Sequence, residues 1–300
     1  MTHPSTIKTT DGPPSAAPSV VRLPASLSLV LPAHNEEANL GPVVAQALAI
    51  LPDFADRFEI IVVDDGSHDA TGAIADALAL TDHRVRAIHH RRNRGYGAAL
   101  RTGFAATTGG FVMFMDSDRQ FDLADLALLS PLASRFDIVA GFRMERNDPL
   151  HRRIFAEIFN VTVRLLFGVH LRDIDCAFKL FRGDLLRGLD LAAPGALINT
   201  EIQAKARRQG ASVAQVGVHH YPRLAGSPTG GSPRVILRAM RETLVLWQRM
   251  RSYRPRAIDQ PVAPASLVPT GHSRDSMVAG AIGALAAVVL AIGRRIVGRR

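Results

Sequence analysis

Two aspartates, Asp116 and Asp118, stand one residue apart directly after the apolar run FVMFM at 111–115. Residues two apart in an extended segment point to the same side of the chain, so both carboxylates face one way. Carboxylates this close repel each other unless a cation lies between them, and Mg²⁺ typically binds one or two carboxylates together with substrate phosphate oxygens. The pair therefore predicts a divalent cation and a phosphate-bearing ligand, most simply a nucleotide diphosphate whose charge the metal neutralises as it leaves.

Two other turns place acidic side chains after apolar runs. PAHNEE at 32–37 follows one run, and DDGS at 64–67 follows another. Helix capping explains one acid in each turn, because carboxylates favour helix N-termini. It does not explain doubled carboxylates at three places, so we expect the three turns to share a ligand.

The segments that must position these turns alternate between strand and helix. The predicted strands are short and apolar, at 26–32, 58–63, 85–90, 111–115 and 137–141. The predicted helices lie between them, at 36–51, 70–80, 95–107 and 123–133. This alternation is typical of βαβ crossovers and predicts an α/β fold with a mostly parallel sheet. Ligands of such sheets bind beyond the carboxyl ends of the strands, which is where all three acidic turns fall.

An NAD-binding Rossmann domain is disfavoured by the glycine pattern. The fingerprint G-x-G-x-x-G should follow the first strand, and it does not occur there. RGYGAALRTG at 94–103 follows the third predicted strand instead, with its glycines in a different order. The start of this helix, around Gly95, can still approach phosphate closely.

Composition indicates a globular chain with a sizeable core, since 47% of the 300 residues are apolar. The single cysteine, Cys176, excludes an internal disulfide and fits a reducing compartment. The net charge of +9 points to nucleic acid, anionic lipid or a phosphorylated substrate as the partner.

The ends of the chain are expected to lie outside the main domain, which we place at 25–254. Residues 1–24 are rich in Pro, Ser and Thr and lack an apolar segment, which predicts a disordered leader. Residues 255–276 are Pro-rich and are expected to form a linker. The uncharged run at 277–292 is shorter than the ~20 residues of a full span, but it extends to 297 if its arginines snorkel. We expect it to anchor the chain in a membrane, with the arginines on the cytoplasmic side; a buried or docking helix is the alternative.

Five motifs follow one another along the chain: VLPAHNEEANL (30–40), IIVVDDGSHDAT (60–71), NRGYGAALRTGF (93–104), FMDSDRQFD (114–122) and DIDCAFKLFR (173–182). Together they resemble those of family 2 glycosyltransferases of the dolichol-phosphate mannosyltransferase type. The resemblance implies a Rossmann-like GT-A domain that binds a nucleotide sugar, followed here by a C-terminal helical tail. It implies inverting transfer of a hexose to a polyprenyl or dolichyl phosphate, with Mg²⁺ or Mn²⁺ as cofactor. GDP-mannose is the first expected donor and UDP-glucose the second.

The resemblance also assigns residues. The turns after the first three strands would bind the nucleotide sugar, through Pro32, His34, Asn35, Glu36, Asp64, Asp65 and Gly95. His34 stands where the family usually has tyrosine. The metal and diphosphate would be held by Asp116, Asp118 and Gln120.

The acceptor can be argued from its chemistry. A lipid phosphate is already ionised near neutral pH, so its attack on the sugar needs no general base. It needs cations that hold it in line with the leaving diphosphate. The candidate cations are Arg143, Arg152, Arg153, Arg182 and Arg223, and Asp175 could orient one of them or the acceptor. Each arginine could instead be a solvated surface charge; Arg143 and one of the pair at 152–153 are favoured.

Residues 233–250 are expected to form a basic amphipathic helix. Arg234, Arg238 and Arg241 share one stripe, while a second stripe is mostly apolar and includes Trp247. Such a helix suits a membrane interface, or it packs on the core with a basic outer face. We therefore expect a membrane-associated protein whose catalytic domain lies on the cytoplasmic face.

Other functional classes fit less well. Nucleic-acid binding is disfavoured by the 6% aromatic content, by the lack of a reading motif and by the acidic turns. A non-catalytic nucleotide-binding relative is disfavoured because the aspartate pair is intact. A processive polysaccharide synthase would carry Q-x-x-R-W, which WQRMR at 247–251 does not match. An enzyme with a small or protein acceptor is the strongest alternative.

Overall fold

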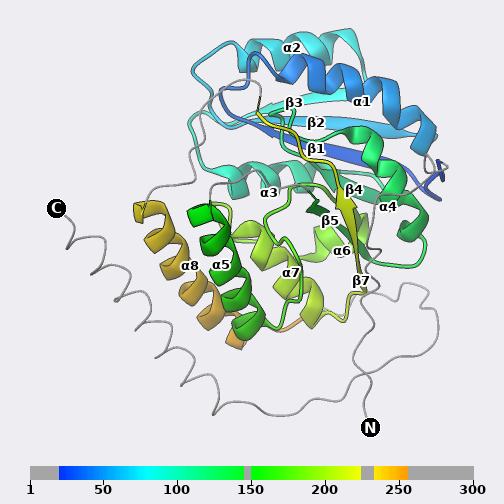
Figure 1. The fold of residues 1–300 in the computed structure, drawn as a ribbon. Helices are drawn as coiled ribbons and strands as arrows, with labels where there is room; N and C mark the ends of the chain where they lie inside the picture. The colour runs from blue at the N-terminus through cyan, green and yellow to red at the C-terminus, as the bar shows by residue number, and fades with distance from the viewer. Residues whose placement is uncertain (1–19, 145–149, 224–232, 256–300) are drawn as a thin grey trace. The chain divides into compact units, whose positions relative to one another are not determined.

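A seven-stranded sheet forms the centre of the structure, with the strand order β3-β2-β1-β4-β6-β5-β7 (Figure 1). The strands are β1 (Leu27–Ala33), β2 (Phe58–Asp64), β3 (Val85–His89), β4 (Phe111–Phe114), β5 (Ile138–Arg143), β6 (Lys179–Arg182) and β7 (Val213–Val218). Strands β3, β2, β1 and β4 are parallel, and so are β5 and β7. Strand β6 runs antiparallel to both of its neighbours, β4 and β5. The predicted parallel sheet is therefore confirmed, with one antiparallel strand inserted in it.

The computed structural model describes residues 20–144, 150–223 and 233–255, all within one compact unit at 7–264. Most of the predicted leader and linker, and all of the predicted anchoring helix at 277–297, lie outside the described residues. Among the helices of the described ranges, none has the length and apolar character needed to cross a membrane.

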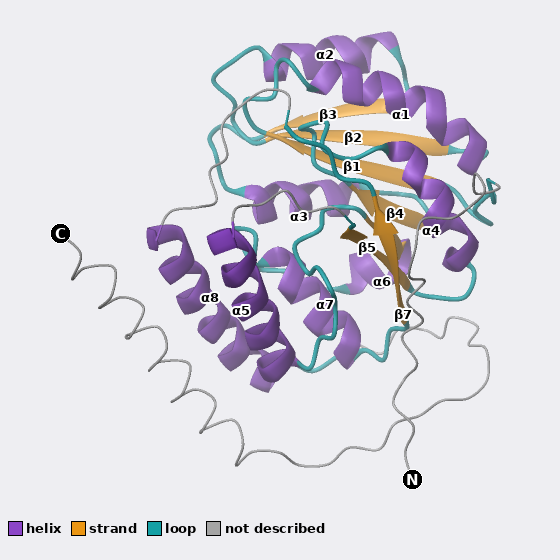
Figure 2. Cartoon of the chain, viewed as in Figure 1, coloured by secondary structure: helices purple, strands orange, loops and turns teal. Residues whose placement is uncertain are grey.

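Helices cover both faces of the sheet. They are α1 (Leu40–Phe54), α2 (Thr71–Thr81), α3 (Tyr96–Ala106), the 3₁₀ turn η1 (Leu123–Asp125), α4 (Leu126–Ala133), α5 (Leu150–Phe167), α6 (Gly183–Gly188), α7 (Ile198–Arg208) and α8 (Pro233–Ser252). Helices α1 and α2 lie on one face of β1–β3, and α3 packs on the opposite face against β1 and β2 (Figure 2). The apolar runs of β1 and β4 are buried along their whole length because both faces are covered.

The path of the chain creates a reversal in strand order beside β1. The chain moves outward from β1 to β2 and β3, and then returns through α3 to β4 on the other side of β1. Right-handed crossovers explain why α1 and α2 share one face and α3 takes the other. The carboxyl ends of β1 and β4 lie side by side at this reversal, which is where open α/β sheets bind their ligands.

Candidate active site

The turns after β1 and β2 are joined by hydrogen bonds. The amide of Asn35 donates to Ser67 Oγ at 3.0 Å, and the amide of Glu36 donates to Thr71 Oγ1 at 2.7 Å. In return, Asn35 Oδ1 accepts from the amide of His68 at 2.9 Å. Two of the three acidic turns are therefore fixed to each other, and the Asn35 side chain makes one of the hydrogen bonds between them.

Asp65 anchors the glycine turn that begins α3. Its Oδ2 accepts from the amide of Gly95 at 2.8 Å, and its Oδ1 accepts from the amide of Arg94 at 2.9 Å. His90 Nδ1 lies 2.6 Å from the same Oδ1. Gly95 has a φ of 95°, and a Cβ there would lie 2.6 Å from the carbonyl oxygen of Pro194, so only glycine fits. The predicted contact of Asp65 with the nucleotide stays a prediction, while its structural role is plain.

Asp64 is held in a similar way by groups of the protein. Its Oδ1 accepts from the amide of Ser67 at 3.0 Å, and its Oδ2 lies 3.1 Å from His89 Nδ1. Burial raises the pKa of Asp64, but the hydrogen bonds with Ser67 and His89 outweigh burial and lower it below the ordinary value. Asp64 is thus a buried anion that braces the turn between β2 and α2.

The aspartate pair lies on the loop after β4, as the sequence predicts. Between the two residues, Ser117 donates its hydroxyl to the carbonyl of Pro32 at 2.9 Å and ties the loop to β1. Asp116 accepts a hydrogen bond from the Tyr96 hydroxyl. Burial, together with the negative charge of Asp118, raises the pKa of Asp116 to about 6. The two carboxylates therefore act on each other across a short distance, which is the repulsion that a divalent cation would relieve.

The segment after β7 runs alongside the aspartate loop. The amide of Tyr221 donates to the carbonyl of Gln120 at 2.8 Å, and Gln120 Nε2 donates to the carbonyl of Tyr221 at 3.0 Å. Closer to β7, His219 pairs with Asp125 through its amide, at 2.6 Å, and its ring, at 2.8 Å. The side-chain amide oxygen of Gln120 takes no part in these bonds, and its predicted role as a metal ligand stays a prediction.

This segment brings Arg223 to the aspartate pair. Arg223 Nη2 lies 2.6 Å from Asp118 Oδ2, and Asp118 Oδ1 accepts from the amide of Gln120 at 3.1 Å. The Asp118 side chain is only 5% exposed, against 32% for Arg223. Arg223 thus reaches the aspartate pair from the segment after β7, 105 residues away from Asp118 in the sequence.

Two carboxylates and one amide oxygen suit a hard divalent cation, which prefers oxygen ligands. No group of three His, Cys, Asp or Glu residues that could hold a metal occurs among the described residues. The predicted ligands Asp116, Asp118 and Gln120 offer the oxygen atoms that Mg²⁺ prefers, and substrate phosphates usually complete such sites. That these residues hold a metal stays a prediction.

Arg143 lies at the carboxyl end of β5 and is paired with Asp173. Its Nε lies 2.6 Å from Asp173 Oδ2, and its Nη2 lies 2.8 Å from Oδ1, a two-point contact that sets the plane of the guanidinium. Burial opposes the charge of Arg143, but the hydrogen bonds with Asp173 raise its pKa above the ordinary value. Asp175 is exposed, and its charge acts on both Arg143 and Tyr96.

Lys179 is a functional candidate that sequence reasoning missed. It is 1% exposed, and its ammonium donates to the backbone carbonyls of Ile174, at 3.1 Å, and Cys176. Its charge also reaches Asp116 and opposes the rise in that pKa. A lysine inside the apolar run AFKLF at 177–181 was the available signal, because a lone lysine is rarely buried without a partner.

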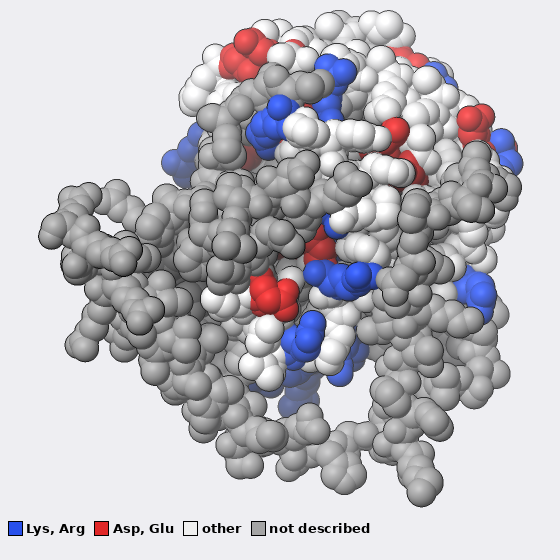
Figure 3. Space-filling model, viewed as in Figure 1, with Lys and Arg blue, Asp and Glu red and all other residues white. Residues whose placement is uncertain are grey.

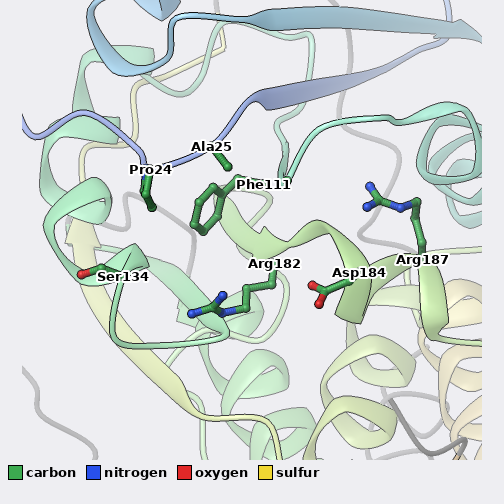
Figure 4. Close-up of a pocket in the computed structure, with 8 residues that line it drawn as sticks. Pro24, Ala25, Phe111, Ser134, Arg182, Asp184 and Arg187 are labelled. Atoms are coloured by element: carbon green, nitrogen blue, oxygen red, sulfur yellow. The ribbon is translucent and has the colours of Figure 1, made fainter. Parts of the chain in front are cut away.

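Arg182 does not belong to the site. Because β6 is antiparallel to β4, Lys179 lies opposite Phe114 at the carboxyl end of β4, and Arg182 lies opposite Phe111 at its beginning. Arg182 pairs instead with Asp137 at 3.2 Å. Figure 4 shows it beside a cavity lined by Asp184 and Arg187 at the opposite edge of the sheet. The prediction that Arg182 binds the acceptor phosphate is therefore corrected.

The other predicted residues have more limited descriptions. His34 is exposed at the end of β1. Arg152 and Arg153 lie in the first turns of α5, but their side chains fall outside the described part of the structure, and their roles remain predictions. Figure 3 draws one face of the molecule in space-filling form. On the described part of that face, Lys and Arg side chains lie next to Asp and Glu side chains.

Comparison with known proteins gives a consistent result. The family model described as Glycosyl transferase family 2 matches residues 28–189. The polyprenol monophosphomannose synthase of Mycolicibacterium smegmatis is 32% identical over 222 residues, which are 70% of this chain and 82% of that protein. The dodecaprenyl-phosphate galacturonate synthase of Rhizobium johnstonii is 35% identical over 174 residues, covering 55% of this chain and 50% of that protein.

This chain spans about half the length of several curated relatives that it matches, the galacturonate synthase among them. Among solved structures, glucosyl-3-phosphoglycerate synthase from Mycobacterium tuberculosis, in complex with Mn²⁺, UDP and phosphoglyceric acid, superposes with a TM-score of 0.61. The match covers 84% of this chain and 88% of that one at 24% sequence identity. The likeness confirms the predicted GT-A fold.

Proposed function

The chain belongs to glycosyl transferase family 2, and from that premise we propose that it transfers a hexose, in the first place mannose, from a nucleotide diphospho-sugar to a polyprenyl phosphate. The observation that carries the proposal is the Asp116–Asp118 pair at the carboxyl end of β4, beside β1, with the guanidinium of Arg223 2.6 Å from Asp118. The similarity to a polyprenol monophosphomannose synthase supports both the lipid phosphate and mannose. UDP-glucose and a non-lipid acceptor are the alternatives that the assay below separates.

The donor diphosphate is assigned to the carboxyl ends of the parallel strands, where the turn at 34–37, the glycine turn at Gly95 and the aspartate loop lie. Asp116, Asp118 and Gln120 would hold the metal, which when bound neutralises charge on the leaving diphosphate. Burial raises the pKa of Glu36, although a hydrogen bond from Asn39 opposes the shift. Glu36 is therefore suited to hydrogen bonding with hydroxyl groups of the donor.

The acceptor phosphate is assigned to the other side of the aspartate pair. Its ionised oxygen forms a bond to the anomeric carbon, the bond from that carbon to the diphosphate oxygen breaks, and the electron pair leaves with the diphosphate, which inverts the anomeric centre. Arg143, oriented by Asp173, and Arg223 supply positive charge for holding the attacking phosphate in line. No proton has to be removed, so no general base is assigned.

Helices α5 and α8 are proposed as the surface that contacts the membrane. They pack side by side (Figure 1), and each exposes large apolar side chains to solvent: Val161 and Leu165 on α5, Leu244 and Val245 on α8. Arg251 stacks over the ring of Trp247 at 5.2 Å. Exposed apolar side chains together with arginines and a tryptophan suit an interface with anionic lipids. The predicted cytoplasmic location rests on the arginines after 292.

Vesicle binding tests this surface. Full-length protein carrying Leu165→Asp and Leu244→Asp should bind vesicles of phosphatidylglycerol and phosphatidylcholine about tenfold more weakly than wild type, because it loses apolar area and gains negative charge. Leu80→Asp is the matched control, since Leu80 is 90% exposed on α2. Unchanged binding by the double variant in a sedimentation assay would exclude the helix pair as the contact.

A transfer assay tests the reaction. Protein is given radiolabelled GDP-mannose or UDP-glucose with a polyprenyl phosphate and Mg²⁺, and label in the organic phase is counted. We expect transfer from GDP-mannose and a loss of about a thousandfold with EDTA, because several kcal/mol of charge stabilisation depend on the metal. Undiminished transfer in EDTA would contradict the metal requirement. Transfer from UDP-glucose alone would replace mannose with glucose.

A further inference from the structure

Arg223 forms an ion pair with Asp118, the carboxylate that the proposed function assigns to the metal. We propose that Arg223 and the divalent cation compete for Asp118, so that the cation binds weakly alone and binds well together with the nucleotide diphosphate. The inference rests on the proposed function, because it takes Asp118 as a metal ligand. It adds a second role for Arg223 and an order in which the site is filled.

The geometry sets the arginine and the metal in competition. Arg223 Nη2 lies 2.6 Å from Asp118 Oδ2, while the other oxygen of the same carboxylate accepts from the amide of Gln120. Mg²⁺ binds an oxygen at about 2.0–2.1 Å. A carboxylate oxygen has a second lone pair, but a cation bound to Asp118 would lie close to the positive charge of the guanidinium. Their mutual repulsion therefore weakens metal binding while the ion pair is in place.

Arg223 is held against Asp118 by the backbone as well as by charge. The chain after β7 runs antiparallel to the aspartate loop. Two hydrogen bonds between Gln120 and Tyr221 hold it there, together with the pairing of His219 with Asp125. This register delivers residue 223 to residue 118. The ion pair is also largely shielded on the Asp118 side, so solvent screens it less than a surface pair.

The charge of Arg223 acts on the whole acidic cluster. It lowers the pKa of both Asp116 and Glu36, against the burial that raises them. The guanidinium thus supplies part of the neutralisation that a divalent cation would provide. Its removal should leave a more negative cluster with an open oxygen on Asp118, which attracts a cation more strongly.

The nucleotide diphosphate resolves the competition because it serves both groups. Its phosphate oxygens complete the coordination of the metal, and phosphate is also a strong partner for a displaced guanidinium, which binds it through two N–H groups. Arg223 therefore exchanges a carboxylate for a phosphate when the donor binds. Because of this coupling, we expect the metal affinity of the wild type to depend strongly on bound nucleotide. In a variant that lacks Arg223, the metal affinity should depend on the nucleotide much less.

Mn²⁺ binding measured by electron paramagnetic resonance of the free ion tests the proposal. Wild type, Arg223→Gln and Arg119→Gln are titrated with Mn²⁺ alone and with Mn²⁺ plus GDP or UDP. Arg223→Gln should bind Mn²⁺ alone about tenfold more tightly than wild type, within the usual range of coupling between two ligands. Arg119→Gln removes an exposed charge from the same loop without freeing Asp118, and its affinity should stay close to wild type. Adding the nucleotide should tighten Mn²⁺ binding more in wild type than in Arg223→Gln.

Asp118→Asn separates the two levels of the proposal, with circular dichroism confirming that each variant is folded. Equal Mn²⁺ affinity in wild type and Arg223→Gln, together with loss of binding in Asp118→Asn, would overturn the competition and leave the metal site standing. Full Mn²⁺ binding in Asp118→Asn would overturn the metal site as well, and with it the proposed metal-assisted transfer.

Discussion

Asp118→Asn is expected to lower the transfer rate by about a thousandfold while the protein stays folded. Asparagine is a weaker, uncharged ligand, so the affinity for the metal falls. The charge of the leaving diphosphate is then stabilised less. The stability effect should be small, because two changes oppose each other. The variant loses the ion pair with Arg223, but it also relieves the repulsion that raises the pKa of Asp116.

Asp122→Asn is the matched control for this prediction. Asp122 lies on the same loop and accepts from the amide of Ala124 at 3.0 Å as a helix cap, a role that asparagine fills equally well. Its transfer rate should stay within about threefold of wild type, well below the thousandfold expected of a metal ligand. Full activity in Asp118→Asn, measured in the same transfer assay, would remove the aspartate pair from the mechanism.

Asp65→Ala is expected to destabilise the protein by about 3 kcal/mol, the cost of removing one partner from a buried charged network. The change leaves the amides of Arg94 and Gly95 and the ring of His90 without their shared acceptor. Chemical denaturation reads the free energy of unfolding, and the midpoint of thermal unfolding should fall by roughly 10 °C.

The control for Asp65→Ala is Asp53→Ala, an exposed aspartate in α1. Its effect should stay within about 0.5 kcal/mol, as for most surface substitutions. The Asp65 variant should also lose activity, because the turn that it anchors carries Tyr96, whose hydroxyl binds Asp116. If Asp65→Ala is as stable as wild type but cannot bind nucleotide, Asp65 acts as a donor ligand rather than as an anchor.

Sequence reasoning located the edge of the sheet that carries the site because apolar runs and the acids after them follow a regular order. Parallel strands bring their carboxyl ends together, so the acids after β1, β2 and β4 had to meet. The pairing of Asp116 with Asp118 was visible for the same local reason. These inferences need only the type and spacing of neighbouring residues.

Strand direction was beyond that reasoning. The strand KLFR at 179–182 was not predicted, and four residues with a basic residue at each end carry no signal of strand direction, so the sequence could not show that β6 is antiparallel. The reversal exchanges the two ends of the strand: Lys179 comes to the site edge, and Arg182 goes to the opposite edge. One topological fact thus accounts both for the residue that was missed and for the one that was misplaced.

The partners of the carboxylates were also out of reach. From the sequence, the carboxylate oxygens of Asp64 and Asp65 were expected to bind a ligand. In the structure they bind His89, His90 and the amides of the glycine turn, 25 to 30 residues further along the chain. Arg223 lies 105 residues from Asp118. Such contacts depend on register between strands that are not adjacent in the chain, which local pattern does not encode.

The most direct test of the proposed function compares two acceptors that differ only in their phosphate. Purified protein with radiolabelled GDP-mannose and Mg²⁺ is given either a polyprenyl phosphate or the polyprenol of the same length, and label in the organic phase is counted. We predict label with the phosphate and only background with the alcohol, because the proposed mechanism uses cations to hold an ionised acceptor and assigns no general base to deprotonate an alcohol. Equal labelling of both lipids, or label confined to a water-soluble product, would contradict transfer to a lipid phosphate.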